Sequence, residues 1–107
     1  MNEIVKKRID EMLEQSPVFV FMKGTPEFPM CGFSARAVGA LKASNARFSS
    51  FNVLDDDEIR EGVRHYANFP TIPQIYIKKQ LVGGSDIVME LYESGELQKM
   101  VKDSAGN

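Results

Sequence analysis

The chain has 107 residues, a formal net charge of -2 and a hydrophobic fraction of 43%. This length suits a single domain over residues 1–107, and the apolar content is sufficient for one core. A binder of duplex DNA needs a basic face, so no nucleic-acid partner is expected. No apolar run approaches the roughly 18–20 residues of a membrane helix, so no membrane partner is expected either.

The single cysteine, Cys31, bears on the cellular compartment. One cysteine cannot form a disulfide within the chain, which fits a reducing environment. It also cannot build a zinc site alone. The first residues, Met1-Asn2-Glu3, resemble neither a signal peptide nor a transit peptide. We therefore expect a cytoplasmic protein, or one of an organelle matrix if a transit peptide has been removed.

In the first half of the chain, helices and strands are predicted to alternate. Apolar residues at helical spacing predict an amphipathic helix over residues 2–15. Val18–Met22 is a short, continuous apolar run, which is typical of a central strand covered on both faces. A loop follows over residues 23–30, because this segment holds a glycine and two prolines. A helix is then predicted over residues 32–43 and a strand over residues 48–54.

The second half is predicted to begin with a helix and a hairpin. Asp55 is expected to cap the helix, with Glu58 three residues later completing a capping box. Residues 68–73 hold two prolines and interrupt regular structure. Two short strands over residues 74–78 and 81–83, joined by the two residues between them, suit a hairpin.

Two helices are predicted to complete the chain, over residues 87–93 and 96–102, with Gly95 ending the first. Residues 103–107 are expected to fray. The early strand–helix–strand unit should be parallel and right-handed, whereas the hairpin should be antiparallel. The sequence therefore predicts an α/β fold, with a mixed four-stranded sheet and helices on both faces.

Cys31 lies in the segment Cys31-Gly32-Phe33-Ser34, between a loop and the start of a predicted helix. A lone cysteine is usually a small buried hydrophobe. A helix N-terminus instead favours the thiolate, which is both the nucleophile and the metal ligand. Ser34 stands where a dithiol enzyme keeps its second cysteine. Cys31 must therefore exchange with an outside thiol or bind something.

Two other motifs each allow two interpretations. In Thr71-Ile72-Pro73, a cis proline would leave the Ile72 N–H and C=O free to pair with an extended peptide. The alternative is an ordinary trans proline that begins a strand. In Gly83-Gly84-Ser85-Asp86, the glycines and the following helix can hold a carboxylate. The alternative there is a turn followed by a helix cap.

With Lys23-Gly24-Thr25-Pro26, these motifs resemble, in order and spacing, those of the monothiol glutaredoxins of the Cys-Gly-Phe-Ser class. The resemblance extends from about Ile4 to Val101. It implies a thioredoxin fold (glutaredoxin-like) with a groove for glutathione. The residues that it implies are Lys23 and Arg60 at the glycine carboxylate, the Ile72 backbone beside a cis Pro73 at the cysteine unit, and Gly84, Ser85 and Asp86 at the γ-glutamyl end.

The chain departs from the family pattern at a few positions. Phe69 stands where members often have Trp, and Ser85 where they often have Cys. Serine keeps the capability to cap a helix, so we expect glutathione binding to survive. The turn Lys78-Lys79-Gln80 lacks the glycine that many relatives have.

The resemblance also implies a function, the binding and transfer of a 2Fe–2S cluster in iron–sulfur assembly or iron homeostasis. Such a cluster takes four thiolates, and Cys31 supplies one as metal ligand. A homodimer bridged by one cluster, with two glutathiones, completes the set, as would a mixed complex in which another protein brings ligands. Further implied partners are BolA-type proteins and apo iron–sulfur acceptor proteins. The alternative is a glutathione-dependent oxidoreductase for protein–glutathione mixed disulfides, with Cys31 as the catalytic nucleophile. We expect such reductase activity to be weak.

For three other features, the sequence predicts no definite function. His65 is expected to be solvated, and the acidic run over residues 55–58 is expected to cap a helix and bind no metal. Phe33 could belong to the core or to the surroundings of a cluster, and the sequence does not decide between them.

Overall fold

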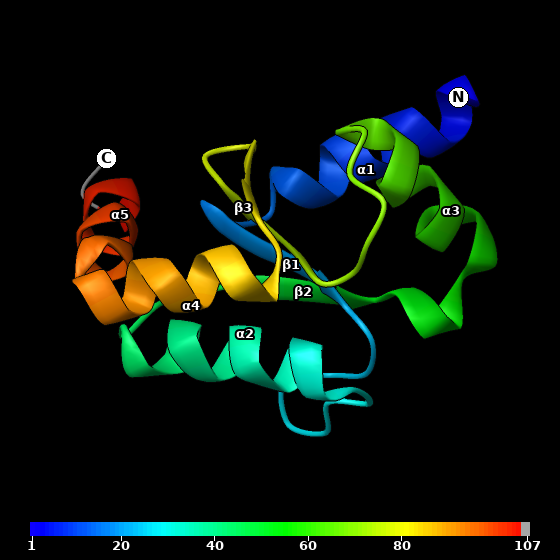
Figure 1. Ribbon diagram of the computed structural model, residues 1–107. Coiled ribbons are helices and arrows are strands. Elements are labelled where there is room, and N and C mark those ends of the chain that lie inside the picture. Colours follow the sequence, from blue (N-terminus) through cyan, green and yellow to red (C-terminus); the bar gives the residue numbers. More distant parts are fainter. Residues whose placement is uncertain (106–107) are drawn as a thin grey trace.

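The computed structural model describes residues 1–105, and in it four strands form one mixed sheet between two layers of helices (Figure 1). The element order is the predicted one, with an added 3-10 turn. The elements are α1 (Glu3–Leu13), β1 (Val18–Met22), α2 (Gly32–Ala43), β2 (Ser49–Asn52), η1 (Val53–Asp55), α3 (Asp57–Tyr66), β3 (Gln74–Ile77), β4 (Gln80–Gly83), α4 (Ser85–Ser94) and α5 (Glu96–Ala105).

The strand order in the sheet is β2-β1-β3-β4. Strands β1 and β2 are parallel, β1 and β3 are antiparallel, and β3 and β4 form an antiparallel hairpin. The predicted α/β class, mixed sheet and strand directions are thereby confirmed. Strand β1 is central, as its continuous apolar run indicated.

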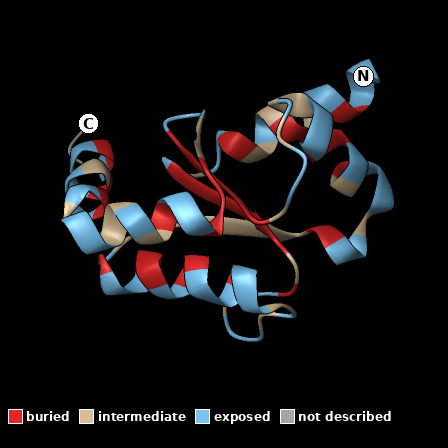
Figure 2. Ribbon diagram, in the orientation of Figure 1, coloured by how far each residue is buried: buried red, intermediate tan, exposed pale blue. Residues whose placement is uncertain are grey.

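The side chains of β1 divide between two cores. Val18, Val20 and Met22 pack on the face covered by α2, α4 and α5. Phe19 and Phe21 pack on the opposite face, against α1 and α3. This division follows from the two-residue repeat of a strand, and it explains why all five residues are buried (Figure 2). Helices on both faces therefore depend on this one strand.

The predicted strand over residues 48–54 is too long, and the cap of α3 is predicted one residue too early. The strand ends at Asn52, whose side chain accepts a hydrogen bond from the Leu54 N–H at 3.0 Å and turns the chain into η1. Because η1 includes Asp55, the cap passes to Asp56, whose carboxylate accepts from the Ile59 N–H at 3.1 Å.

The expected fraying over residues 103–107 is wrong for 103–105, which continue α5. Ser104 is buried, and its hydroxyl donates to the Val101 carbonyl at 2.8 Å. Residues 106–107 lie outside the described part of the chain. Helix α4 begins two residues earlier than predicted and ends at Gly95, which has φ +84°. Over residues 1–105, no helix combines the length and the apolar content needed to cross a membrane.

The hairpin turn lies one residue earlier than predicted. Ile77 pairs with Gln80, so the two-residue turn is Lys78-Lys79. Both lysines have positive φ, 52° and 66°. Tight hairpins favour such dihedrals, but residues with a Cβ adopt them only at a cost of roughly 1–2 kcal/mol each. The two lysines therefore occupy a turn whose positive φ angles would favour Asn-Gly.

We predict that Lys79→Gly stabilises the protein by about 1 kcal/mol, because glycine adopts positive φ without a Cβ penalty. The exposed ion pair of Lys79 with Glu14, at 3.6 Å, contributes too little to reverse the effect. Urea denaturation measures the change. The matched control, Lys99→Gly on the exposed side of α5, should destabilise by about 1 kcal/mol. A Lys79→Gly protein less stable than the wild type would contradict this account.

Candidate functional site

Cys31 is the N-cap residue of α2 and is half-buried. Its Sγ accepts a hydrogen bond from the Ser34 N–H at 3.3 Å and lies 3.3 Å from Ser34 Oγ. Ser34 is fully buried, and its Oγ also accepts from the Lys23 N–H at 3.1 Å. With an acceptor position of Ser34 Oγ already filled, its hydroxyl proton is available to an ionised Sγ.

These contacts favour the thiolate. Partial burial acts to raise the pKa of the Cys31 thiol, but hydrogen bonds from Ser34 Oγ and from two backbone N–H groups at the start of α2 act against it. The charge of Lys23 adds to them, and the pKa lies below its ordinary value. Cys31 is therefore no buried hydrophobe, and Ser34 does more than replace a second thiol.

The loop over residues 23–30 is folded back on itself. Thr25 and Phe28 exchange backbone hydrogen bonds at 3.2 and 3.0 Å, and the Met30 N–H donates to the Lys23 carbonyl at 2.9 Å. Gly24 has φ +89°, and a Cβ there would lie 2.5 Å from the Phe28 carbonyl oxygen. The loop is thus tightly constrained where it leads into Cys31.

Apolar side chains flank Cys31 at the surface. Phe28 and Met30 are 76% and 66% exposed, and Phe33 is 55% exposed. Phe33 therefore does not belong to the core, which removes one of its two interpretations. The Arg36 guanidinium lies 5.2 Å from the centre of the Phe33 ring, on the next turn of α2.

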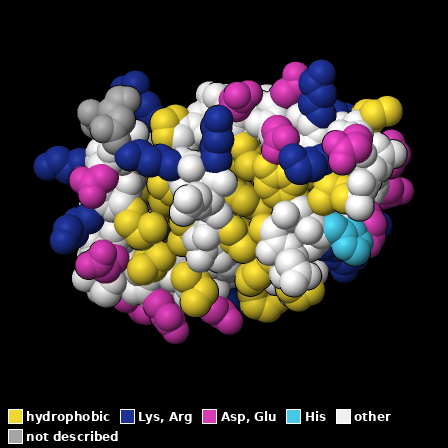
Figure 3. Space-filling model, turned by 90° about the horizontal axis from the view of Figure 1, so that it is seen from above, with side chains coloured by type: hydrophobic (Ala, Val, Ile, Leu, Met, Phe, Trp, Pro, Cys, Tyr) yellow, Lys and Arg dark blue, Asp and Glu magenta, His cyan; other side chains and the backbone are white. Residues whose placement is uncertain are grey.

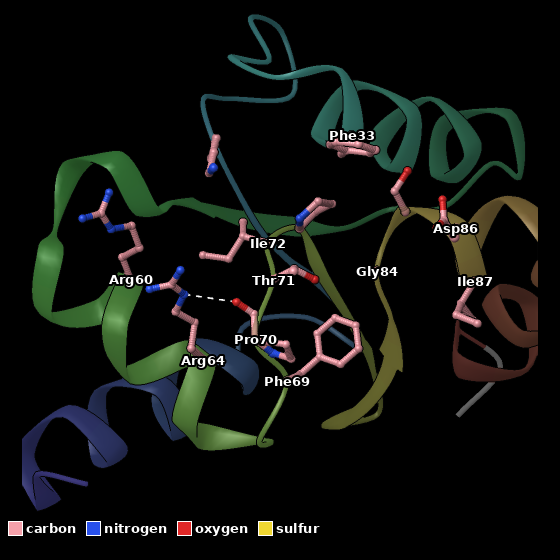
Figure 4. A pocket seen from close by; sticks show the side chains of 13 residues that line it. Phe33, Arg60, Arg64, Phe69, Pro70, Thr71, Ile72, Gly84, Asp86 and Ile87 are labelled. Atoms are coloured by element: carbon pink, nitrogen blue, oxygen red, sulfur yellow. Dashed lines mark hydrogen bonds between the residues drawn. The ribbon is translucent and has the colours of Figure 1, made fainter.

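A cavity of about 800 Å³ lies between α2, α3, the loop before β3 and the start of α4, and we call it the groove (Figure 4). All six residues implied to contact glutathione line it, and Phe33, from the turn that holds Cys31, lines it as well. Arg60 and Arg64 reach it from α3, Asp86 lies on the opposite side, and Ile72 lies between them. The full lining is Lys23, Phe33, Arg60, Arg64, Phe69, Pro70, Thr71, Ile72, Pro73, Gly84, Ser85, Asp86 and Ile87.

The Ile72–Pro73 peptide bond is cis, which excludes the trans alternative. No residue from 1 to 105 forms a hydrogen bond with the Ile72 N–H or carbonyl. This backbone pair can therefore bind an extended peptide lying in the groove.

The end of the groove at α4 differs from the expectation in one respect. Gly84 is the N-cap, and no side chain caps α4, so Ser85 does not serve as the cap that we expected. Ser85 is instead the first helical residue, and its buried Oγ has no partner among residues 1–105. The N–H groups of this turn and the carboxylate of Asp86 suit a ligand end with both a carboxylate and an ammonium group.

Arg64 lines the groove but was missed at the level of sequence. Its Nε donates to the Pro70 carbonyl at 3.1 Å, and its Nη1 lies 3.2 Å from Glu61. Its position four residues after Arg60 places both on one face of a helix, which is the signal that could have revealed it.

His65, which was expected to be solvated, lies at the surface. His65 is 65% exposed, lies 3.3 Å from Glu61, and is visible at the surface in Figure 3. The same view shows hydrophobic side chains gathered across the middle of the face and charges around its rim. Within residues 1–105, no group of three or more His, Cys, Asp or Glu side chains could hold a metal ion.

The sequence model of the glutaredoxin family matches residues 18–82, which is more than half of the chain. The chain belongs to the glutaredoxin family. It is 49% identical to "Uncharacterized monothiol glutaredoxin ycf64-like" of Synechocystis sp., over 95% of each protein. It is also 47% identical to "Monothiol glutaredoxin-5, mitochondrial" of Lachancea kluyveri, over 92% of this chain and 71% of that protein. The recognition as a monothiol glutaredoxin is thereby confirmed.

Not every relative has the length of this chain. The match to Monothiol glutaredoxin-S11 of Oryza sativa, at 46% identity, spans 95% of this chain but only 21% of that protein. The glutaredoxin domain is therefore a small part of some relatives.

Membership of the family implies a glutathione-related function.

Solved structures agree with the fold. Reduced poplar apo GrxS14 is 43% identical and superposes with a TM-score of 0.84, over 96% of this chain and 94% of that one. A buckwheat glutaredoxin–glutathione complex also has a TM-score of 0.84, over 96% and 92%. At 22% identity, this second likeness concerns the fold alone. The predicted thioredoxin fold is confirmed.

We predict that Ser34→Ala raises the pKa of the Cys31 thiol, because the thiolate loses a hydroxyl donor. The substitution also removes the acceptor of the Lys23 N–H, which should lower the free energy of unfolding by about 1–3 kcal/mol. Thiolate absorbance followed against pH measures the first effect, and urea denaturation the second. Ser104→Ala is the control, since it removes a buried hydroxyl in α5 and should leave the Cys31 pKa unchanged. An unaltered Cys31 pKa in Ser34→Ala would refute the hydrogen-bond account.

Proposed function

We propose that this monothiol glutaredoxin binds glutathione in the groove and carries a 2Fe–2S cluster between proteins, as cargo ligated by Cys31. The observation that carries the proposal is a cysteine with a lowered pKa beside a groove of matching chemistry. The process served would be iron–sulfur assembly or iron homeostasis.

The groove suits glutathione along its whole length. Lys23 and Arg60 provide cations for the glycine carboxylate, and the unpaired Ile72 N–H and C=O match the central cysteine unit. At the other end, the turn over residues 84–86 suits the carboxylate and ammonium of the γ-glutamyl group. The glutaredoxin family to which the chain belongs has a glutathione-related function, which supports the same ligand here.

The ligand count supports a shared cluster. Residues 1–105 offer one thiol, and they contain no group of acidic or histidine side chains that could replace the others. Four thiolates are therefore reached with two chains and two glutathiones, one cluster bridging a homodimer. Cys31 suits this, because its Sγ is only partly buried and is disposed to ionise.

Partners and location are proposed on the same basis. A cluster held half by a small diffusible thiol is readily released, which suits delivery to apo iron–sulfur proteins. A BolA-type protein could replace one partner chain and supply its own ligand. We expect the protein to act in the cytoplasm or in an organelle matrix, where glutathione is abundant and thiols stay reduced.

The lowered pKa of Cys31 also favours a second function, reduction of protein–glutathione mixed disulfides. The Cys31 thiolate would attack the glutathione sulfur and release the protein thiolate, forming a Cys31–glutathione disulfide. A free glutathione thiolate would then attack the glutathione sulfur of that disulfide, releasing glutathione disulfide and the Cys31 thiolate. We expect this activity to be weak, and Cys31→Ser to abolish it.

We predict that Cys31→Ser abolishes cluster binding and leaves the fold intact, because the cluster loses its ligand while a small partly exposed side chain is replaced. Anaerobic reconstitution with glutathione, followed by iron and sulfide analysis and circular dichroism, tests both parts. Ser104→Ala serves as the control and should load fully. A folded Cys31→Ser protein that retains iron and acid-labile sulfide would show that the ligand set is different.

We predict that Lys23→Ala weakens glutathione binding about ten-fold, and the cluster-bridged dimer, which holds two glutathiones, about ten-fold or more. Loss of one cation from a bound carboxylate costs about 1–3 kcal/mol, and 1.4 kcal/mol corresponds to ten-fold. Size-exclusion chromatography and iron analysis over a range of glutathione concentrations measure the effect. Lys99→Ala removes an exposed lysine of α5 and should change nothing. A holo dimer that persists after glutathione is removed would contradict the proposed ligand set.

A further inference from the structure

The segment over residues 69–72 forms one wall of the groove, yet it belongs to no helix or strand. Its neighbours in the chain are Asn68, with φ +52°, and the cis Pro73. A groove wall without a helical or sheet hydrogen-bond pattern must be held by other contacts if it is to present a fixed backbone. The side chain of Gln74, at the start of β3, supplies two of them.

Gln74 is fully buried. Its Nε2 donates to the Phe69 carbonyl at 2.9 Å and to the Thr71 carbonyl at 3.3 Å. Both amide protons are therefore used on the groove wall. The position requires an amide side chain, because no apolar side chain of similar size could donate hydrogen bonds to the two carbonyls.

Tyr76 orients this amide. Its buried hydroxyl donates to Gln74 Oε1 at 2.9 Å, so the oxygen of the amide is directed toward Tyr76 and the nitrogen toward the wall. Burial raises the pKa of the Tyr76 hydroxyl, which keeps it protonated and able to donate. The Tyr76 ring lies between the rings of Phe21 and Tyr66, both edge-on contacts, so the donor itself is well anchored.

Arg64 holds the Pro70 carbonyl, which lies between the two carbonyls bound by Gln74. Its Nε donates to the Pro70 carbonyl at 3.1 Å, the bond drawn in Figure 4. Three successive carbonyls, of Phe69, Pro70 and Thr71, are thus each engaged by a side chain. Ile72 is the next residue, and its N–H and C=O are engaged by none of residues 1–105.

We propose that Gln74, oriented by Tyr76, is a positioning residue that fixes the wall over residues 69–72 so that the Ile72 N–H and C=O meet an extended peptide ligand. The inference rests on the proposed function for the identity of that ligand, glutathione. Gln74 does not line the groove, so it would act on a ligand only through the wall. Arg64 holds the same wall from α3, but it lies in the groove itself, so Gln74 gives the cleaner test.

The test uses Gln74→Met, which keeps the length of the side chain and removes both amide donors. Titration of the reduced protein with glutathione, followed by amide NMR, should show a dissociation constant raised about ten-fold, since two wall carbonyls lose their donors. The Cys31 pKa should not change, because it is shifted by burial and by groups of Ser34, Phe33 and Lys23, none of which contacts Gln74 through a hydrogen bond. A wild-type dissociation constant in Gln74→Met would overturn the proposal.

Lower stability alone must be distinguished from loss of positioning. Val101→Ala, in the core on the far side of the sheet, is the control of comparable destabilisation and should bind glutathione normally. Tyr76→Phe should weaken binding less than Gln74→Met, and the double variant no more than Gln74→Met, because Tyr76 acts through Gln74. Fully additive losses, or equal weakening by Val101→Ala, would overturn the proposal.

A measurement without ligand separates this inference from the proposed function. In the ligand-free protein, amide hydrogen exchange at Phe69, whose N–H donates to the Arg64 carbonyl at 3.1 Å, should quicken in Gln74→Met and stay at the wild-type rate in Val101→Ala once corrected for global stability. Unchanged exchange at the wall would overturn the role of Gln74 whatever the ligand is. Failure of the wild type to bind glutathione, with faster exchange in Gln74→Met, would overturn the ligand and keep the positioning role.

Discussion

The structure depends first on the burial of β1 from both sides. Val18, Val20 and Met22 build one core, and Phe19 and Phe21 build the other, so a single five-residue strand holds both helical layers in place. Its end also leads directly into the site, because the next N–H, that of Lys23, donates to Ser34 beneath Cys31. The position of the thiol is therefore set by the most buried strand of the sheet.

The irregular segments of the site are held in place by polar side chains. These side chains are buried or half-buried and form hydrogen bonds with backbone groups. Asn52 accepts from the Gly24 N–H at 2.9 Å and so ties the loop before Cys31 to the end of β2. Ser34 ties the same loop to α2, and Gln74 ties the groove wall to β3. Loops held in this way keep a fixed shape without a regular hydrogen-bond pattern, which a pre-formed binding site requires.

The charges of the site contribute little to the stability of the fold, and their placement is the one that the proposed ligand, an extended zwitterion, would require. The Arg60–Asp57 and Arg64–Glu61 pairs are exposed, at 3.5 and 3.2 Å, so they contribute little to stability. Their cations remain available at one side of the groove, with the carboxylate of Asp86 on the other. Stability comes from the two cores, whereas the proposed recognition of glutathione would come from the rim of the groove.

From sequence, the strand–helix order, the buried β1 and the place of Cys31 at a helix start followed from local signals: apolar periodicity, glycine and proline positions, and a lone thiol. The six residues implied to contact glutathione, and the cis Pro73, were predicted from the resemblance to a family. The turn at Lys78-Lys79, the cap at Asp56, and the roles of Ser34, Arg64 and Gln74 emerged only from the folded chain. Those features depend on which backbone groups lie within hydrogen-bond reach of a side chain after packing, as with Ser34 and Lys23, eleven residues apart. The pattern of neighbouring residues in the sequence does not predict such distances. They arise only when β1 is buried between the two helical layers and brings distant segments together.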